Sequence, residues 1–163
     1  MSDPRWDDVR DVIVQDGHDT VFRVVDTTTA DWQAVLDLIR SRHWRYEYGE
    51  DGVAVPMPDR ATDILDRAEG TFPSLWVWPA AVLLAVFEPV YADQVRFGID
   101  LRQAKGQQRF DLLCGFLRTV GQLLDRPVFM ARDDESGTDG ANLVYRPEVD
   151  RVMILRPPAI NDN

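Results

Sequence analysis

Apolar residues recur with a helical period in two parts of the chain. Between residues 30 and 42, Trp32, Val35, Leu36 and Ile39 stand at i, i+3, i+4 and i+7, and Thr27–Thr29 precede them as capping residues. A longer apolar stripe runs from residue 107 to 124 and ends at Asp125-Arg126-Pro127. The two patterns predict the principal helices of the fold, and a short polar segment at 60–68 predicts a third helix.

The segment HWRYEYGEDGVAVPM changes to a period of two, which is typical of a strand. Trp44, Tyr46 and Tyr48 fall on one face of it, where they either pack beneath a helix or anchor a partner. A turn at 49–52 leads to a second strand at 53–57. Further strands are expected at the following ranges: 9–15, 20–26, 75–78, 94–101, 128–131, 142–146 and 149–155. Asp16-Gly17 predicts a hairpin between the first two of these, and Pro147-Glu148 a hairpin between the last two.

The most hydrophobic passage is PSLWVWPAAVLLAVFEPVY, residues 73–91. Its uninterrupted apolar part, residues 75–87, is too short to cross a bilayer, which takes about 20 residues. We therefore expect a core segment between the sheet and the long helix. Pro79 fits the first position of a short buried helix over 80–87, and a second buried strand over the same residues is the alternative. Trp76 and Trp78 share one strand face, which is exposed if that side of the sheet is uncovered.

Strands and helices are interspersed, and hairpins outnumber strand–helix–strand units. These features predict an α+β fold: a mixed, mainly antiparallel sheet with two principal helices packed on one face. The length of 163 residues fits a single domain, residues 1–163. We expect about five residues at the N-terminus and about six at the C-terminus to be frayed.

The chain carries a net charge of −10, with 28 acidic and 18 basic residues. Such a surface disfavours nucleic acid, whose binding depends on Lys and Arg displacing counterions. It favours a basic protein partner, although acidity also serves solubility alone. The acidic N-terminus lacks the order of a secretory signal, so a cytoplasmic location is expected, with no membrane partner.

Candidate chemistry is sparse. His18 and His43 lack the spacing of a metal motif, and no metal site or cofactor is predicted. Cys114 lies within the apolar stripe of the long helix, which indicates a buried, inert thiol. The loop ARDDESGTDGAN does not match a calcium-binding loop. A protein-binding module is therefore favoured over a small hydrolase or transferase whose site is assembled from distant loops.

The candidate partner-binding residues combine acidic clusters with aromatic anchors. They are Tyr48, Glu50, Asp51, Trp76, Asp133, Asp134 and Glu135. In this hypothesis the acids steer a basic partner, and an aromatic side chain holds it.

The segment FGIDLRQAKGQQRFDLLCGFLRTVGQLLDRPVFMARDDES…LVYRPEVDRVMIL joins a strand, an apolar helix, a second strand, an acidic loop and a closing hairpin. Over residues 73–156 this order resembles small bacterial α+β immunity proteins, which neutralise polymorphic toxins. The resemblance implies a stoichiometric inhibitor of a toxin enzyme that uses no cofactor. It carries over no functional residue.

Overall fold

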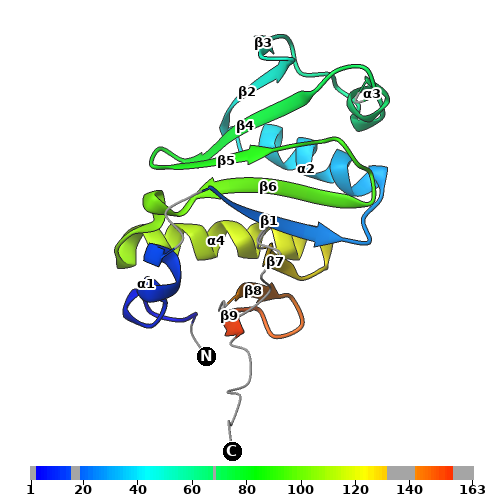
Figure 1. The fold of residues 1–163 in the computed structure, drawn as a ribbon. Coiled ribbons are helices and arrows are strands. Elements are labelled where there is room, and N and C mark those ends of the chain that lie inside the picture. The colour runs from blue at the N-terminus through cyan, green and yellow to red at the C-terminus, as the bar shows by residue number, and fades with distance from the viewer. Residues whose placement is uncertain (1–2, 16–18, 68, 132–141, 156–163) are drawn as a thin grey trace, which may run out of the picture.

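The computed structural model describes residues 3–15, 19–67, 69–131 and 142–155 (Figure 1). The helices are α1 (Trp6–Gln15), α2 (Thr29–Ser41), α3 (Ala61–Arg67), the 3-10 helix η1 (Leu101–Ala104) and α4 (Gln107–Leu124). The strands are β1 (Asp19–Val25), β2 (Arg45–Glu50), β3 (Val53–Ala54), β4 (Pro73–Ala80), β5 (Leu83–Phe87), β6 (Gln94–Asp100), β7 (Val128–Ala131), β8 (Asn142–Arg146) and β9 (Arg151–Leu155).

The strands of the described residues form one nine-stranded sheet in the order β3-β2-β4-β5-β6-β1-β7-β8-β9. Each strand pair between these neighbours is antiparallel, so the sheet is not mixed as the sequence suggested. The α+β class itself is confirmed. The N-terminal strand β1 lies near the middle, between β6 and β7, and brings the two ends of the sequence into one sheet.

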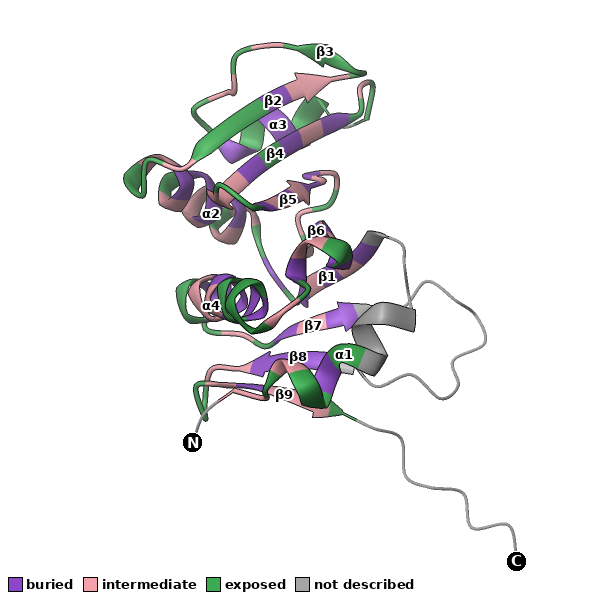
Figure 2. Cartoon of the chain, turned by 90° about the vertical axis from the view of Figure 1, so that its left-hand side faces the viewer, coloured by how far each residue is buried: buried purple, intermediate pink, exposed green. Residues whose placement is uncertain are grey.

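Helices α2 and α4 lie on the same side of the sheet (Figure 2). Rings from strands and helices meet there: Phe97 of β6 lies 5.0 Å from Phe87 of β5 and 5.3 Å from Phe116 of α4, between ring centroids. Trp32 of α2 completes the cluster, and its Nε1 donates to the carbonyl of Tyr91 at 2.8 Å. The ring contacts therefore join both principal helices to the central strands.

Helix α4 has the predicted bounds, 107–124. Gly106 precedes it with φ +90°, and Asp125 ends it in the left-handed conformation with φ 51°. Gly121 lets α4 approach the sheet, because a Cβ there would collide with the ring of Tyr145 on β8. Cys114 is 1% exposed on the covered side, which confirms its burial.

The chain start is a helix, so the strand predicted at 9–15 is wrong. Trp6 packs against Phe110 of α4, and Val9, three residues later, is fully buried. The helical signals were Pro4 ahead of the first turn and two acids within it, Asp7 and Asp8. In the sequence, the β-branched residues of this segment favoured a strand over these helical signals. The expected turn at Asp16-Gly17 lies outside the described residues.

The apolar passage forms two paired strands, β4 and β5. The alternative of a second strand over 80–87 is therefore confirmed, with the bounds Leu83–Phe87, and the short helix is wrong. Pro79 lies at a register shift between Val77 and Ala80, an irregularity where a strand tolerates proline. Phe87 is buried as expected, whereas Leu84 points to the other face and is only partly buried. No helix in the described part of the chain is long and apolar enough to cross a membrane.

Other elements differ from the expected bounds by a few residues. The strand predicted at 53–57 is only Val53–Ala54, because two prolines follow it at 56 and 58. The strand expected at 149–155 begins at Arg151, after a turn in which Asp150 adopts φ 48°. Leu101, expected at the end of a strand, opens η1 instead. The remaining predicted strands and helices are present.

Candidate functional site

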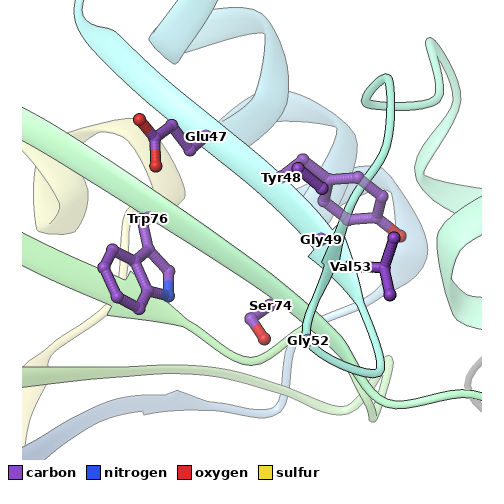
Figure 3. Close-up of a pocket in the computed structure, with 8 residues that line it drawn as sticks. Glu47, Tyr48, Gly49, Gly52, Val53, Ser74 and Trp76 are labelled. Atoms are coloured by element: carbon purple, nitrogen blue, oxygen red, sulfur yellow. The ribbon is translucent and has the colours of Figure 1, made fainter.

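A shallow hollow of about 200 Å³ lies where β2, β3 and β4 meet (Figure 3). Gly49 of β2 and Ser74 of β4 are paired in register. Because both side chains are small, they do not fill the floor of the hollow. Glu47 and Trp76, the next pair on the same face, form one wall. The β2–β3 hairpin forms the opposite wall through Val53 and its neighbours.

The hairpin that closes this hollow turns at Asp51 and Gly52. Both residues have positive φ, 52° and 79°, as a two-residue type I′ turn requires, and the Asp-Gly pair suits that turn. The hairpin approaches β2 so closely that a Cβ at Gly49 would lie 3.1 Å from the carbonyl oxygen of Val53. The wall is therefore a direct result of the local sequence Gly-Glu-Asp-Gly.

Trp76 belongs to a row of exposed rings and charges on the face of the sheet opposite α2 and α4. Its ring centroid lies 6.3 Å from that of Trp78, two residues along β4. Arg45 of β2 places its Cζ 4.2 Å from the Trp78 ring centroid, a cation–π contact, and its Nη2 lies 3.3 Å from Glu47. With 45% of its surface exposed, Trp76 is open to a partner, as expected for an uncovered sheet face.

Tyr48 lies on the covered side instead and is 4% exposed. Its hydroxyl donates to Glu50 at 3.0 Å, and Arg67 of α3 donates to the same carboxylate at 3.0 Å. Burial, and then the Glu50 hydrogen bond, raise the pKa of Tyr48 well above its usual range. The Tyr48 ring is thus part of the core, and Glu50 is held by its neighbours with 17% of its side chain exposed.

The carboxylate of Asp51 accepts a hydrogen bond from the Phe72 backbone N–H at 2.8 Å, which ties the hairpin turn to the start of β4. The residue itself is exposed. Asp133, Asp134 and Glu135 lie outside the described residues. Of the predicted partner-binding set, Glu50, Asp51 and Trp76 lie at one end of the sheet, but Glu50 shares the covered face with Tyr48, opposite Trp76.

This end of the sheet also carries many acidic residues. Residues 47–69, which include the hairpin and α3, contain seven acids and two arginines, a net charge of −5 out of the chain's −10. The side chain of Asp59 is fully exposed, and Asp63 and Asp66 are exposed on α3. Of these acids Glu47 lines the Trp76 hollow, whereas Glu50 and α3 lie toward the covered side of the sheet.

A second, more polar hollow of about 530 Å³ lies between the chain start and α4. It is lined by Asp3, Arg5, Asp7, Gln107 and Asp111. Three of its side chains are bonded within the fold, and one of them, Asp111, accepts from the Gln107 amide at 2.7 Å. Asp3 accepts from Arg118 at 2.7 Å and from the Val152 N–H at 2.9 Å, and Gln107 accepts from the Trp6 N–H at 2.8 Å. These bonds fasten α1 to α4 and β9.

The reactive residue types are separated. Burial raises the pKa of the Cys114 thiol well above its usual range. His43 is exposed in the link from α2 to β2, and His18 lies outside the described residues. Within the described ranges, the acids, histidines and cysteine form no group of three or more that could hold a metal ion.

Sequence reasoning missed Glu47, Gly49 and Ser74, which shape the hollow beside Trp76. The period-two pattern at 44–48 had already placed Glu47 on the face opposite the tyrosines. Its position next to Trp76 depends on the β2–β4 register, however, and the chain segments that pair are about 30 residues apart in sequence.

Among the described residues, the antiparallel sheet leaves one face open, with an exposed tryptophan beside a shallow hollow at one end. No protein-family model matches the chain, and neither a curated protein nor a solved structure matches it significantly.

Proposed function

We propose that the protein is a cytoplasmic protein-binding module, a stoichiometric inhibitor of the immunity type whose partner is a basic toxin enzyme. The observation that carries this proposal is the exposed Trp76 at the acidic end of an uncovered sheet face. Tryptophan is among the residues most often found as interface anchors. A half-exposed ring beside a hollow offers a partner side chain both an apolar wall and a place to insert.

The charges around Trp76 indicate the sign of the charge that the partner's surface carries. With half of the chain's net charge in residues 47–69, this end attracts cationic surfaces and raises the rate of encounter. Glu47, opposite Trp76 in the register, has 60% of its side chain exposed. A lysine or arginine of the partner could lie over the Trp76 ring and reach this carboxylate.

The two hollows differ in what they offer a small molecule. The Trp76 hollow, about 200 Å³, is below the roughly 300–1,000 Å³ of ordinary ligand pockets. The larger hollow includes groups that are bonded within the fold, such as Asp3. This contrast favours protein binding over the alternative of a small hydrolase or transferase.

The experiment measures separately whether Trp76 anchors the partner and whether the acidic residues steer it. A partner is first isolated from the native host with the wild-type chain, and its association and dissociation rates are measured. Trp76→Ala should speed dissociation about tenfold to a hundredfold, since anchors act mainly on complex lifetime. Tyr91→Ala is the matched control, because Tyr91 is 59% exposed in the link between β5 and β6.

The steering variant replaces Asp59, Asp63 and Asp66 by Asn. It should slow association and flatten the dependence of the association rate on salt. The control replaces three exposed acids elsewhere, Asp111→Asn, Asp125→Asn and Glu148→Gln. An acidic partner, or equal effects of both triple variants, would contradict the electrostatic part of the proposal. Unchanged dissociation in Trp76→Ala would contradict the anchor.

A further inference from the structure

The sheet has two edges, and they differ in how they are protected from pairing with another chain. β3 lies at one end of the strand order and β9 at the other (Figure 1). β3 is only two residues long and prolines follow it at 56 and 58, so it offers little backbone to an incoming strand. β9 has five residues, RVMIL, with no proline. An apolar edge strand of this kind pairs readily with other chains unless something covers it.

One outward backbone group of β9 is covered by a side chain. Val152 is paired in register with Tyr145 of β8, yet its N–H donates to the carboxylate of Asp3 at 2.9 Å. This N–H therefore points away from β8, and the pair is of the non-hydrogen-bonded kind. Because the two kinds of pair alternate along an antiparallel ladder, the backbone groups of Ile154 also point outward. In the described part of the chain, no further strand lies along this side of β9.

Asp3 is held in this position by α4. Its carboxylate accepts from Nη2 of Arg118 at 2.7 and 2.8 Å, and only 18% of its side chain is exposed. The same arginine donates from Nε to Asp150, in the turn before β9, at 2.9 Å. Arg118 thus ties the segment ahead of α1 to the edge strand through charge-assisted hydrogen bonds, which are the stronger kind. A loop or a charged group laid over an edge is a common device against edge pairing.

We propose that the outer edge of β9 is a pairing surface for β9 of a second copy of this chain, and that Asp3 keeps this surface closed. The register is centred on Met153, so that Val152 of each copy lies opposite Ile154 of the other. Both of these residues have outward backbone groups, so each such pair exchanges two hydrogen bonds in an antiparallel ladder. With Asp3 in place, the carboxylate occupies the first of the donors that this ladder needs.

The side chains of β9 indicate why a second copy is the occupant. Val152 is 1% exposed and Ile154 packs against the core, so both belong to the covered face. A two-fold axis through Met153, perpendicular to the sheet, keeps the covered faces of the two copies on the same side. It also places Arg151 opposite Leu155 and not opposite a second arginine, which would be unfavourable. The edge is therefore complementary to itself in hydrogen bonding, in apolar side chains and in charge.

The first experiment measures self-association of the full chain by sedimentation equilibrium. It is carried out at about 0.15 M salt and above, because the net charge of −10 opposes association until it is screened. The wild type is expected to be a monomer, and Asp3→Ala should associate at least about tenfold more tightly, as a dimer. Asp7→Ala removes the same charge from an exposed position on α1 and should remain a monomer. A monomeric Asp3→Ala, or a wild type already paired through β9, would overturn the proposal.

Two further variants test whether the association uses this edge. Met153→Lys in the Asp3→Ala background places two lysines opposite each other at the two-fold axis and should restore the monomer. The substitution also makes the net charge less negative, so a general loss of repulsion predicts the opposite result. Asp3→Asn keeps an oxygen that accepts from the Val152 N–H and should dimerise less than Asp3→Ala. Association that persists with Met153→Lys would place the contact elsewhere and contradict the assignment to β9.

Amide exchange separates strand pairing from loss of the fold. In Asp3→Ala, the amides of Val152 and Ile154 should exchange more slowly as the protein concentration rises, as followed by NMR. Arg118→Gln opens the edge in a second way, since it leaves Asp3 in the chain and removes the group that holds it. This variant should also dimerise, and it decides the matter if Asp3→Ala loses its cooperative unfolding transition. Association without concentration-dependent protection of these two amides would show that the proposal is wrong.

This surface is independent of the proposed partner-binding function. β4, which carries Trp76, is separated from β9 by five strands in the sheet. Trp76→Ala should therefore leave the dimerisation of Asp3→Ala unchanged, whereas it should shorten the lifetime of the partner complex. Failure of one proposal leaves the other intact. A dimer of Asp3→Ala that is lost with Trp76→Ala would instead be formed through the uncovered face, and the role of β9 would be refuted.

Discussion

The two faces of the sheet use their side chains differently. On the face under α2 and α4, the ring of Phe97 contacts three other rings, those of Phe22, Phe87 and Phe116. On the opposite face, Trp76 is almost half exposed, and guanidinium groups lie over the rings of Trp78 and Phe129. The covered face is organised by packing, and the uncovered face carries residues that the fold does not need for its core.

Burial alone therefore does not identify the partner-binding surface. A half-exposed tryptophan is costly to display unless a partner covers it, since large apolar rings gain most when they are desolvated. The covered face should therefore determine stability, and the uncovered face should determine binding.

The largest difference in the free energy of unfolding is expected between two substitutions on β5. Phe87 is 1% exposed among other rings, so Phe87→Ala should lower the free energy of unfolding by about 3–5 kcal/mol. Leu84 lies on the other face of the same strand, and Leu84→Ala should cost less than about 1.5 kcal/mol. Urea unfolding measures both. Equal costs would show that the uncovered face is packed as tightly as the covered one.

Two glycines of α4 offer a second contrast. Gly121→Ala should destabilise by about 1–3 kcal/mol, because the new methyl group meets the buried ring of Tyr145 and lies 3.3 Å from the Arg126 carbonyl. Gly115→Ala meets nothing within 4 Å and should stabilise by up to about 1 kcal/mol through helix propensity. Thermal unfolding of the two variants would decide this. If both substitutions stabilised the protein, α4 would not be packed tightly against β8.

Trp76 should contribute little to folding. Trp76→Ala is expected to change the free energy of unfolding by about 1 kcal/mol or less, since the ring is 45% exposed. Urea unfolding can be compared with the dissociation rate of the partner complex measured on the same variant. A loss as large as that of Phe87→Ala would identify Trp76 as a structural residue and remove the main support for the binding surface.

The smallest effect concerns the edge of the sheet at Asp150. Its carboxylate accepts from the Tyr145 hydroxyl at 2.7 Å and from Arg118 at 2.9 Å, and these contacts hold the pKa of Asp150 below its usual range. A carboxyl group with a lowered folded-state pKa stabilises the fold above the unfolded-state value, about 3.9, and loses that effect as the pH falls through the folded-state pKa.

Asp150→Asn should therefore be less stable than the wild type near pH 7, and the gap should close as the pH falls below about 4. Denaturant midpoints of both proteins across this range provide the measurement. A gap that stays constant at low pH would mean that the lost hydrogen bonds matter rather than the charge.

The same two faces explain which interpretations of the sequence succeeded. The stripe at 107–124 faces the core along its whole length, so its period was unambiguous and α4 has the predicted bounds. In β5 the open-face residues Leu84 and Val86 are also apolar, and this hides the period of two that marks a strand. Burial of Cys114 was predictable because its neighbours on the helix stripe are apolar.

The α+β class, the two principal helices and the turn at Asp51 and Gly52 could be predicted, because each depends on residues close together in the chain. The positions of Trp76 beside Glu47 and of Arg23 opposite Arg96 could not, because they depend on how distant strands pair. These pairs join segments about 30 and 73 residues apart, and a shift of one residue in register would turn each side chain to the other face. The position of the candidate site therefore depends on strand pairing, which is set by contacts throughout the core and not by neighbouring residues in the chain.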